Sequence, residues 1–150
     1  MSPRSDENLR AEYLLIQTQY EAFDQRALSV KGLATPLLGA GVAVGLKEGS
    51  CAILGATVLV ALSLWLLEAI WKSFQYCLSD RIILLEAWFR GQGSGEIPAF
   101  QIFTSWSEAW SARYNRPASW FPILRQPFVY LPYAPIAFVG LIGSIWAGGH

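Results

Sequence analysis

The sequence predicts an all-α integral membrane protein with three transmembrane helices, on three observations. Hydrophobic residues make up 53% of the 150 residues and charged residues only 15%, against about 25% charged in an ordinary soluble domain. The apolar residues gather in three blocks, 32–46, 51–71 and 127–149, whose only charge is Glu68. Between and within the blocks, apolar side chains recur every three or four residues, which is the spacing of one helix face.

A heptad stripe predicts the first helix. It begins in a polar arm at 5–30 and continues into a first span at 27–46, while other positions of the arm, such as Glu12 and Gln17, are polar. The span reaches the length needed to cross a bilayer only if Lys31 extends its ammonium to the head groups. The stripe consists of Leu9, Tyr13, Ile16, Tyr20, Phe23, Ala27, Val30, Ala34, Leu37, Gly41 and Val44.

Small residues at i,i+4 spacing mark two helix-packing faces. Gly41 and Gly45 form a GxxxG pattern in the first span, and Gly140 and Ser144 form a similar stripe near the C-terminus. In lipid, small residues allow close backbone contact and so identify the packing face of a helix. Two interpretations stay open, a tight hairpin within one chain and an interface between subunits.

The second helix is predicted to span the membrane at 51–71 and to continue in water to about residue 90, because no Gly or Pro intervenes between Gly55 and Gly91. A four-residue turn at 47–50 connects it to the first span. The two spans therefore form a hairpin that extends into the cytoplasm as an antiparallel helix pair.

A short amphipathic helix is predicted at 99–112, and a third span at 127–147. Trp106 and Trp110 share one face of the short helix, and Trp120 follows between arginines. Tryptophan at this density suits the membrane–water interface, which makes these three residues interfacial anchors. The alternative is that the tryptophan face packs on the cytoplasmic helices.

The distribution of basic residues predicts the orientation. Ten of the eleven Lys and Arg residues lie in the N-terminal segment or in 72–125, and the C-terminal tail has none. Basic residues favour the cytoplasmic side. We therefore expect the N-terminus in the cytoplasm and the C-terminus outside, in a bacterial inner membrane. No cleaved signal peptide is expected, because the first 26 residues contain no apolar core segment.

Glu68 is the single ionisable residue within an apolar block. Intramembrane acids often serve ion or proton pathways, but Glu68 also stands four residues before Lys72, the favourable order for a helical ion pair. The sequence favours the ion pair. Two charged pairs, Asp24 with Arg26 and Asp80 with Arg81, lie just beyond the spans and are interpreted as a network between the helices or as solvated charges.

No catalytic motif is present, so no enzymatic activity, cofactor or metal site is predicted. The two cysteines, 26 residues apart, are interpreted as buried small side chains. The net charge is zero, which gives no indication of a nucleic-acid partner. The expected partners are the lipid bilayer and either further copies of the chain or another membrane protein.

Three functions are compatible with this predicted architecture. The first is a small oligomeric inner-membrane protein that forms a pore or perturbs the membrane, suggested by the small-residue stripes. The layout of cytoplasmic helix, transmembrane hairpin and further helix is similar to that of small bacterial membrane effectors of antiviral defence. The second is an accessory or scaffold subunit that anchors a partner protein. The third is a small ion- or proton-coupled transporter that uses Glu68.

Overall fold

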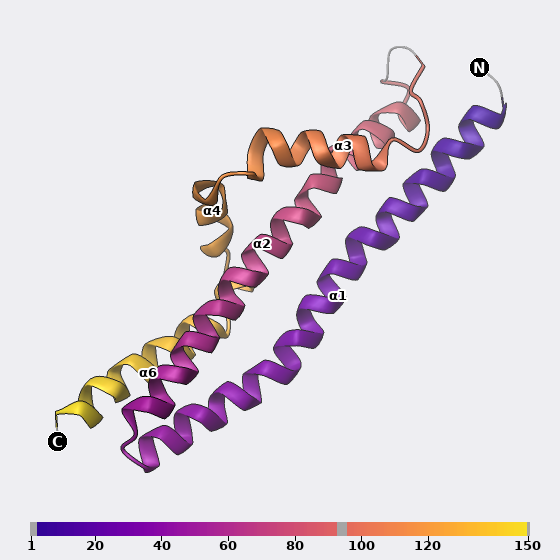
Figure 1. The fold of residues 1–150 in the computed structure, drawn as a ribbon. Helices are drawn as coiled ribbons and strands as arrows, with labels where there is room; N and C mark the ends of the chain where they lie inside the picture. Colours follow the sequence, from indigo (N-terminus) through magenta and orange to yellow (C-terminus); the bar gives the residue numbers. More distant parts are fainter. Residues whose placement is uncertain (1–2, 93–95, 150) are drawn as a thin grey trace. The chain divides into compact units, whose positions relative to one another are not determined.

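The computed structural model describes residues 3–92 and 96–149, which contain helices and no strand (Figure 1). In chain order the elements are α1 (Pro3–Lys47), α2 (Cys51–Phe89), α3 (Ile102–Ala109), the π-helix η1 (Trp110–Tyr114), the 3₁₀-helix η2 (Pro117–Trp120), α4 (Phe121–Leu124), α5 (Pro127–Tyr130) and α6 (Tyr133–Gly148). The predicted all-helical class is therefore confirmed. The predicted second helix, 51 to about 90, lies close to the observed bounds of α2.

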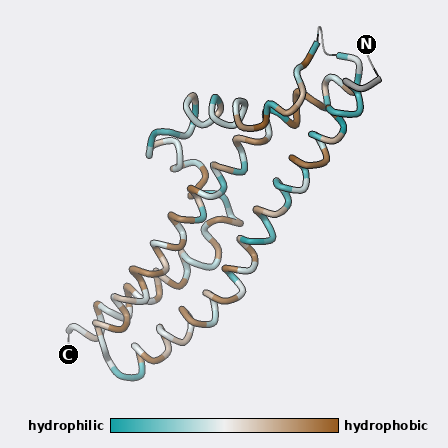
Figure 2. Tube along the Cα trace, turned by 45° about the vertical axis from the view of Figure 1, so that its right-hand side comes forward, coloured by the Kyte–Doolittle hydropathy of each residue, from teal (hydrophilic) through white to brown (hydrophobic). Residues whose placement is uncertain are grey.

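Two helices, α1 and α2, are long and apolar enough to cross a membrane. In the most apolar 18-residue window of each, only 11% and 28% of the residues are buried. The central helix of a soluble protein would bury most of such a window. Figure 2 shows the apolar character concentrated along α6 and the N-terminal half of α2, whereas the N-terminal half of α1 alternates between polar and apolar residues.

The predicted third span is divided in the structure. Helix α5 ends at Tyr130, Leu131 is extended, and α6 starts at Tyr133. With 16 residues, α6 is about 24 Å long, somewhat less than the hydrocarbon thickness of about 30 Å. Pro132 and Pro135 at the start of α6 explain why the helix does not extend back to residue 127.

The chain divides into two compact units. Unit 1 comprises Met1–Gln25 and Trp71–Trp120, and unit 2 comprises Arg26–Ile70 and Phe121–His150. Helices α1 and α2 each contribute one segment to each unit. In unit 1 the buried core consists of Leu9 and Ile16 from α1 with Leu78 and Leu85 from α2, and Ile97, Ile102 and Trp106 pack against it.

In unit 2, segments of α1 and α2 pack against α6, and small residues lie at the contacts between these helices. Its core contains Leu38, Val58, Ala61, Tyr133 and Ala137. A β-carbon at Gly41 would lie 2.5 Å from Thr57 Oγ1, and one at Gly45 would lie 2.7 Å from Leu54 Cγ. At Gly140 a β-carbon would lie 2.7 Å from Val58 Cγ2. The glycines therefore allow close helix contacts within a single chain, which is one of the two interpretations that the sequence left open.

The heptad stripe is wrong in its last part. Leu37 and Val44 were assigned to the buried face but are 72% and 46% exposed, whereas Leu38 and Val42 are buried. Leu37 lies four heptads beyond Leu9, and a straight α-helix drifts by about 20° per heptad relative to a seven-residue repeat. The accumulated drift of about 80° is nearly the 100° between neighbouring residues, so the buried face moves forward by one position.

Candidate functional site

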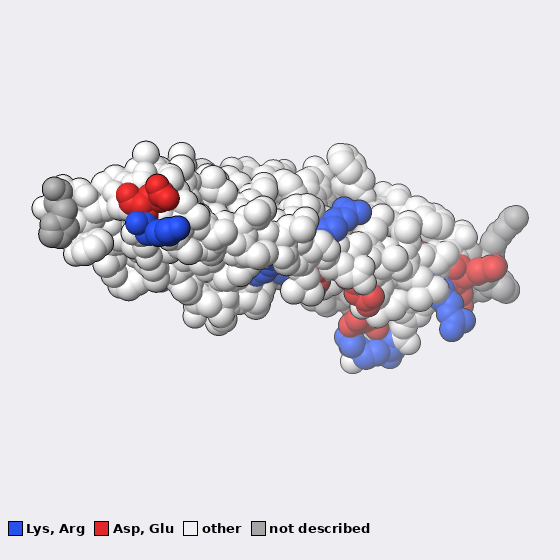
Figure 3. All heavy atoms as spheres, turned by 90° about the horizontal axis from the view of Figure 1, so that it is seen from below, with Lys and Arg blue, Asp and Glu red and all other residues white. Residues whose placement is uncertain are grey.

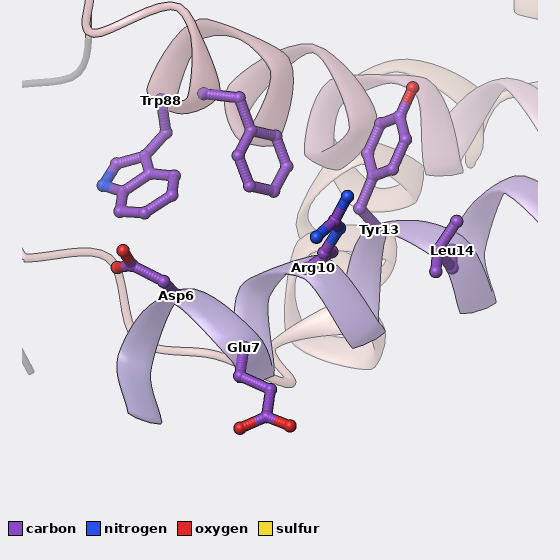
Figure 4. A pocket seen from close by; sticks show the side chains of 7 residues that line it. Asp6, Glu7, Arg10, Tyr13, Leu14 and Trp88 are labelled. Atoms are coloured by element: carbon purple, nitrogen blue, oxygen red, sulfur yellow. The ribbon is translucent and has the colours of Figure 1, made fainter. Parts of the chain in front are cut away.

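A groove of about 640 Å³ opens in unit 1 between the first turns of α1 and the C-terminal end of α2. In Figure 4 the Asp6 and Arg10 side chains point toward the aromatic wall, and Glu7 points away from it. The lining residues are Asp6, Glu7, Arg10, Tyr13, Leu14, Trp88 and Phe89.

The wall of this groove is aromatic and held in place by specific contacts. The ring of Phe89 makes edge-on contacts with Tyr13, at 5.8 Å between centroids, and with Trp88, at 5.2 Å. The Tyr13 hydroxyl donates a hydrogen bond to Glu86 at 3.2 Å. Desolvation and the Glu86 carboxylate raise the pKa of that hydroxyl above its usual value.

Many protein–protein interfaces have an apolar, aromatic centre surrounded by polar or charged side chains, as the aromatic wall of this groove is. Aromatic residues and arginine are enriched at the energetic centres of interfaces, and a polar rim surrounds them. Here Leu14 remains 59% exposed beside the rings. The groove can therefore receive an apolar side chain of a partner and offer charges of both signs around it.

A buried ion pair lies next to the core of unit 1. The guanidinium of Arg81 binds the carboxylate of Glu12 through two hydrogen bonds of 2.9 Å, from Nε and Nη2. The Glu12 side chain is fully buried, and that of Arg81 is 5% exposed. The prediction that Glu12 lies on the polar face of α1 is wrong. Of the two interpretations of Arg81, the network between the helices is present, with Glu12 as the partner, and the solvated charge is not.

The same pair fixes the segment that leads into α3. The Phe100 amide donates to Glu12 Oε2 at 2.7 Å, and Arg81 Nη2 donates to the Pro98 carbonyl at 2.7 Å. Phe100 has a φ of 60°, a conformation that costs a bulky residue about 1–2 kcal/mol. The buried carboxylate offsets this cost, because it satisfies the amide that the conformation directs inward.

A second polar cluster joins the two helices of unit 1 at Asp24. Its carboxylate binds the Lys72 ammonium and accepts a 3.1 Å hydrogen bond from Gln75, whose amide also donates to the Tyr20 carbonyl at 2.8 Å. Burial acts to raise the pKa of Asp24, but the hydrogen bonds from Lys72 and Gln75 and the Lys72 charge outweigh it and lower the pKa. A network between the helices, which the sequence left open for Asp24, is therefore present, with Lys72 as the partner.

Other charges of unit 1 are also paired. Asp80 binds Arg113, and Glu86 lies 3.9 Å from Arg90, one helical turn further along the chain. On the face that Figure 3 shows, red and blue atoms are adjacent in several places, and much of the surface between these places is uncharged. Cys77 is buried, as expected from the sequence, and burial raises the pKa of its thiol to about 11. Cys51 is exposed, so the interpretation of both cysteines as buried is wrong for Cys51.

In unit 2, Glu68 forms an ion pair of 2.7 Å with Lys31 of α1. Their side chains are 7% and 16% exposed. Lys31 also donates to the Phe128 carbonyl, and its ammonium lies 5.8 Å from the centroid of the Tyr133 ring. Lys31, which was expected to reach the head groups, therefore has internal partners. The i,i+4 pair of Glu68 with Lys72 stays a prediction.

The predicted interfacial tryptophans all have contacts within unit 1. Trp106 donates to the Phe74 carbonyl at 3.1 Å, and Trp110 packs edge-on against Phe74, at 5.0 Å between centroids. Trp120 donates to the Tyr114 carbonyl at 3.1 Å. The tryptophan face of α3 and η1 thus packs on α2, the alternative interpretation. Phe103, on the same helix, is 78% exposed.

Sequence reasoning missed both Glu12 and the groove. A signal for Glu12 existed, because it lies three residues after Leu9 and four before Ile16, which places it on the buried face of an α-helix. The groove had no comparable signal, since it depends on which turn of α1 faces Trp88. Comparisons of the chain with protein-family models, with curated proteins and with solved structures find no match.

Proposed function

We propose that this chain is a membrane-anchored scaffold without enzymatic activity. Unit 2 is its anchor in the lipid bilayer, and unit 1 is a preformed helical platform on the cytoplasmic side that binds a partner protein. The observation that carries the proposal is the groove beside Trp88, with its aromatic wall, the charged side chains around it and the exposed Leu14.

The surface of unit 2 supports its role as an anchor. Large aliphatic and aromatic side chains are exposed on each of its three main helices, including Leu33 on α1, Leu59 on α2 and Ile145 on α6, which are 72%, 67% and 78% exposed. A soluble protein rarely exposes contiguous apolar surface of this kind. Its buried charges, Lys31 and Glu68, are paired, as is required of ionised groups in an apolar medium.

The register of α6 supports a third crossing. A β-carbon at Gly148 would lie 3.5 Å from Cys51 Sγ, Gly140 lies beside Val58, and Tyr133 packs in one core cluster with Ala61. Helix α6, about 24 Å long at 1.5 Å per residue, therefore lies alongside the 51–61 part of α2. The C-terminus then lies on the side of the 47–50 turn, opposite the N-terminus.

A pore and a transporter have less support. The pore was suggested by small-residue stripes open to other subunits, but Gly41, Gly45 and Gly140 have neighbours within the chain. The transporter requires Glu68 to exchange protons or ions, but Glu68 is ion-paired with Lys31 and only 7% exposed. The scaffold needs neither feature.

Site-directed photo-crosslinking tests the scaffold proposal. A photoreactive phenylalanine derivative replaces either Leu14, in the groove, or Ile83, which is similarly exposed at 58% in unit 1 but does not line the groove. We expect irradiation of intact cells to give one adduct of constant mass from position 14 and none from position 83.

The Trp88→Ala variant of the position-14 protein removes the aromatic wall and should abolish the adduct while the protein stays in the membrane fraction. Equal adducts from both positions, or no adduct from position 14, would contradict a partner site in the groove. Extraction of the protein by alkaline carbonate would contradict the anchor.

A further inference from the structure

A second groove lies in unit 2, between α2 and α4. Its volume is about 320 Å³, at the lower end of the range for small-molecule pockets. Three side chains of α2 form one wall, and α4 with the residue after it forms the other. The lining residues are Leu62, Trp65, Leu66, Phe121, Leu124 and Arg125.

The two walls of this groove are joined by a hydrogen bond. The Trp65 indole N–H donates to the Leu124 carbonyl at 3.0 Å, so the polar atom of the tryptophan is satisfied and its apolar rings form part of the groove. Leu66 is 43% exposed and Phe121 58% exposed. The groove is therefore open along its side and lined by carbon atoms.

Arg125 places a positive charge at one edge of this apolar groove. Its guanidinium carbon lies 4.8 Å from the centroid of the Phe121 ring, a cation–π contact that orients the side chain. Within residues 3–92 and 96–149, no carboxylate forms an ion pair with Arg125. Arg125 is exposed, so its charge is available to a ligand from outside the chain.

The position of the groove along α2 indicates the leaflet. Leu62 and Leu66 precede Glu68, in the part of the 51–71 span that is proposed to lie on the cytoplasmic side. That leaflet carries the anionic lipids, and basic pockets between membrane helices bind their head groups. An apolar groove next to a cation matches an acyl chain joined to a phosphate.

We propose that this groove binds an anionic glycerophospholipid, with one acyl chain against Leu62 and Leu66 and the phosphate at Arg125. The guanidinium suits the phosphate because it donates two parallel hydrogen bonds to its oxygens. This inference rests on the proposed membrane anchor, since an acyl chain reaches the groove from the bilayer.

Native mass spectrometry of the purified full chain tests the lipid site. The protein, in a mild detergent, is titrated with phosphatidylglycerol or with phosphatidylcholine of the same acyl chains. We expect phosphatidylglycerol to remain bound at one site with at least about tenfold higher affinity, as one charge-assisted contact provides. Arg125→Gln should remove this preference, whereas Arg116→Gln, at another exposed arginine, should keep it.

Leu66→Trp and Leu67→Trp test the acyl-chain part of the site. Both leucines are exposed, at 43% and 50%, but only Leu66 lines the groove. Leu66→Trp should fill the groove and lower phosphatidylglycerol occupancy, while Leu67→Trp should not. Equal binding of the two lipids, an unchanged preference in Arg125→Gln, or displacement by glycerol phosphate without acyl chains would overturn the proposal. These outcomes leave the anchor intact, which carbonate extraction tests separately.

Discussion

At the scale of single residues, the polar contacts of unit 1 resemble those of a folded soluble protein. Glu12 and Arg81 satisfy each other and the backbone of the 98–100 segment, and Asp24 binds Lys72 and Gln75. The Glu12–Arg81 pair is buried and fully paired, and such a pair specifies one arrangement, because any other arrangement leaves a charge desolvated and unpaired. The structure of unit 1 should therefore depend strongly on these few side chains.

Glu12→Gln should destabilise unit 1 by about 3–5 kcal/mol, the usual cost when one partner of a buried ion pair is removed. Arg81 would keep its charge without a counter-charge. Arg90→Gln is the control, since Arg90 belongs to an exposed pair worth about 1 kcal/mol or less. Urea unfolding in detergent, followed by tryptophan fluorescence, measures both. Equal effects of the two substitutions would show that the Glu12 pair is not buried in solution.

Asp24 should give stability a dependence on pH. Its pKa is lowered from 3.8 in the folded chain. Such a group stabilises the fold above its unfolded pKa, and this contribution is lost as the pH falls through the folded pKa. We expect the difference in Tm between the wild type and Asp24→Asn to be constant above about pH 5 and to shrink below pH 3.8.

Thermal unfolding at several pH values measures this difference. The Asp24 side chain is 49% exposed, so solvent screens its interaction with Lys72 and the effect should be modest. A difference in Tm that stays the same from pH 7 to pH 3 would contradict the ion pair.

At the scale of helices, the sequence predicts the two long elements well and their faces less well. Periodicity and the absence of Gly and Pro determine where α2 begins and ends, so 51 to about 90 could be predicted. The buried face of α1 could be predicted up to Ala34, but Leu37 and Val44 were misplaced because a heptad repeat accumulates drift. The groove beside Trp88 was not predictable, because it depends on the pairing of α1 with α2.

Helix packing in unit 2 is tested by two glycines that differ in their surroundings. Gly41→Ala should destabilise the chain by about 1–3 kcal/mol, the usual cost of overpacking, because its methyl group would meet Thr57 at 2.5 Å. A β-carbon at Gly39 would meet no other atom within 4 Å. Gly39→Ala should therefore stabilise α1 by up to about 1 kcal/mol, because alanine loses less backbone entropy in a helix than glycine does. Thermal unfolding in detergent measures the Tm of each glycine variant, and light scattering measures its oligomeric state.

Opposite signs for the two glycine variants, with the oligomeric state unchanged, are expected if Gly41 serves packing within the chain. If Gly41→Ala instead leaves Tm unchanged and dissociates an oligomer, the stripe belongs to an interface between subunits.

At the scale of the whole molecule, we propose that unit 2 lies in the bilayer and unit 1 in the cytoplasm. The exposed apolar side chains of unit 2 and the paired charges of unit 1 support this division. The basic residues support the proposed direction, since ten of eleven stand in residues 1–31 or 72–125. The turn at 47–50 and the C-terminus would then share the outer side.

Cysteine accessibility tests this claim most directly. Single cysteines replace Glu48 in the turn, Leu59 in α2, Glu108 in α3 or Gly149 near the C-terminus, in a chain whose Cys51 and Cys77 are replaced by serine. With a membrane-impermeant maleimide, we expect labelling of positions 48 and 149 in intact cells, of position 108 only after permeabilisation, and of position 59 in neither. Labelling of position 59, or of positions 48 and 108 from the same side, would contradict the account.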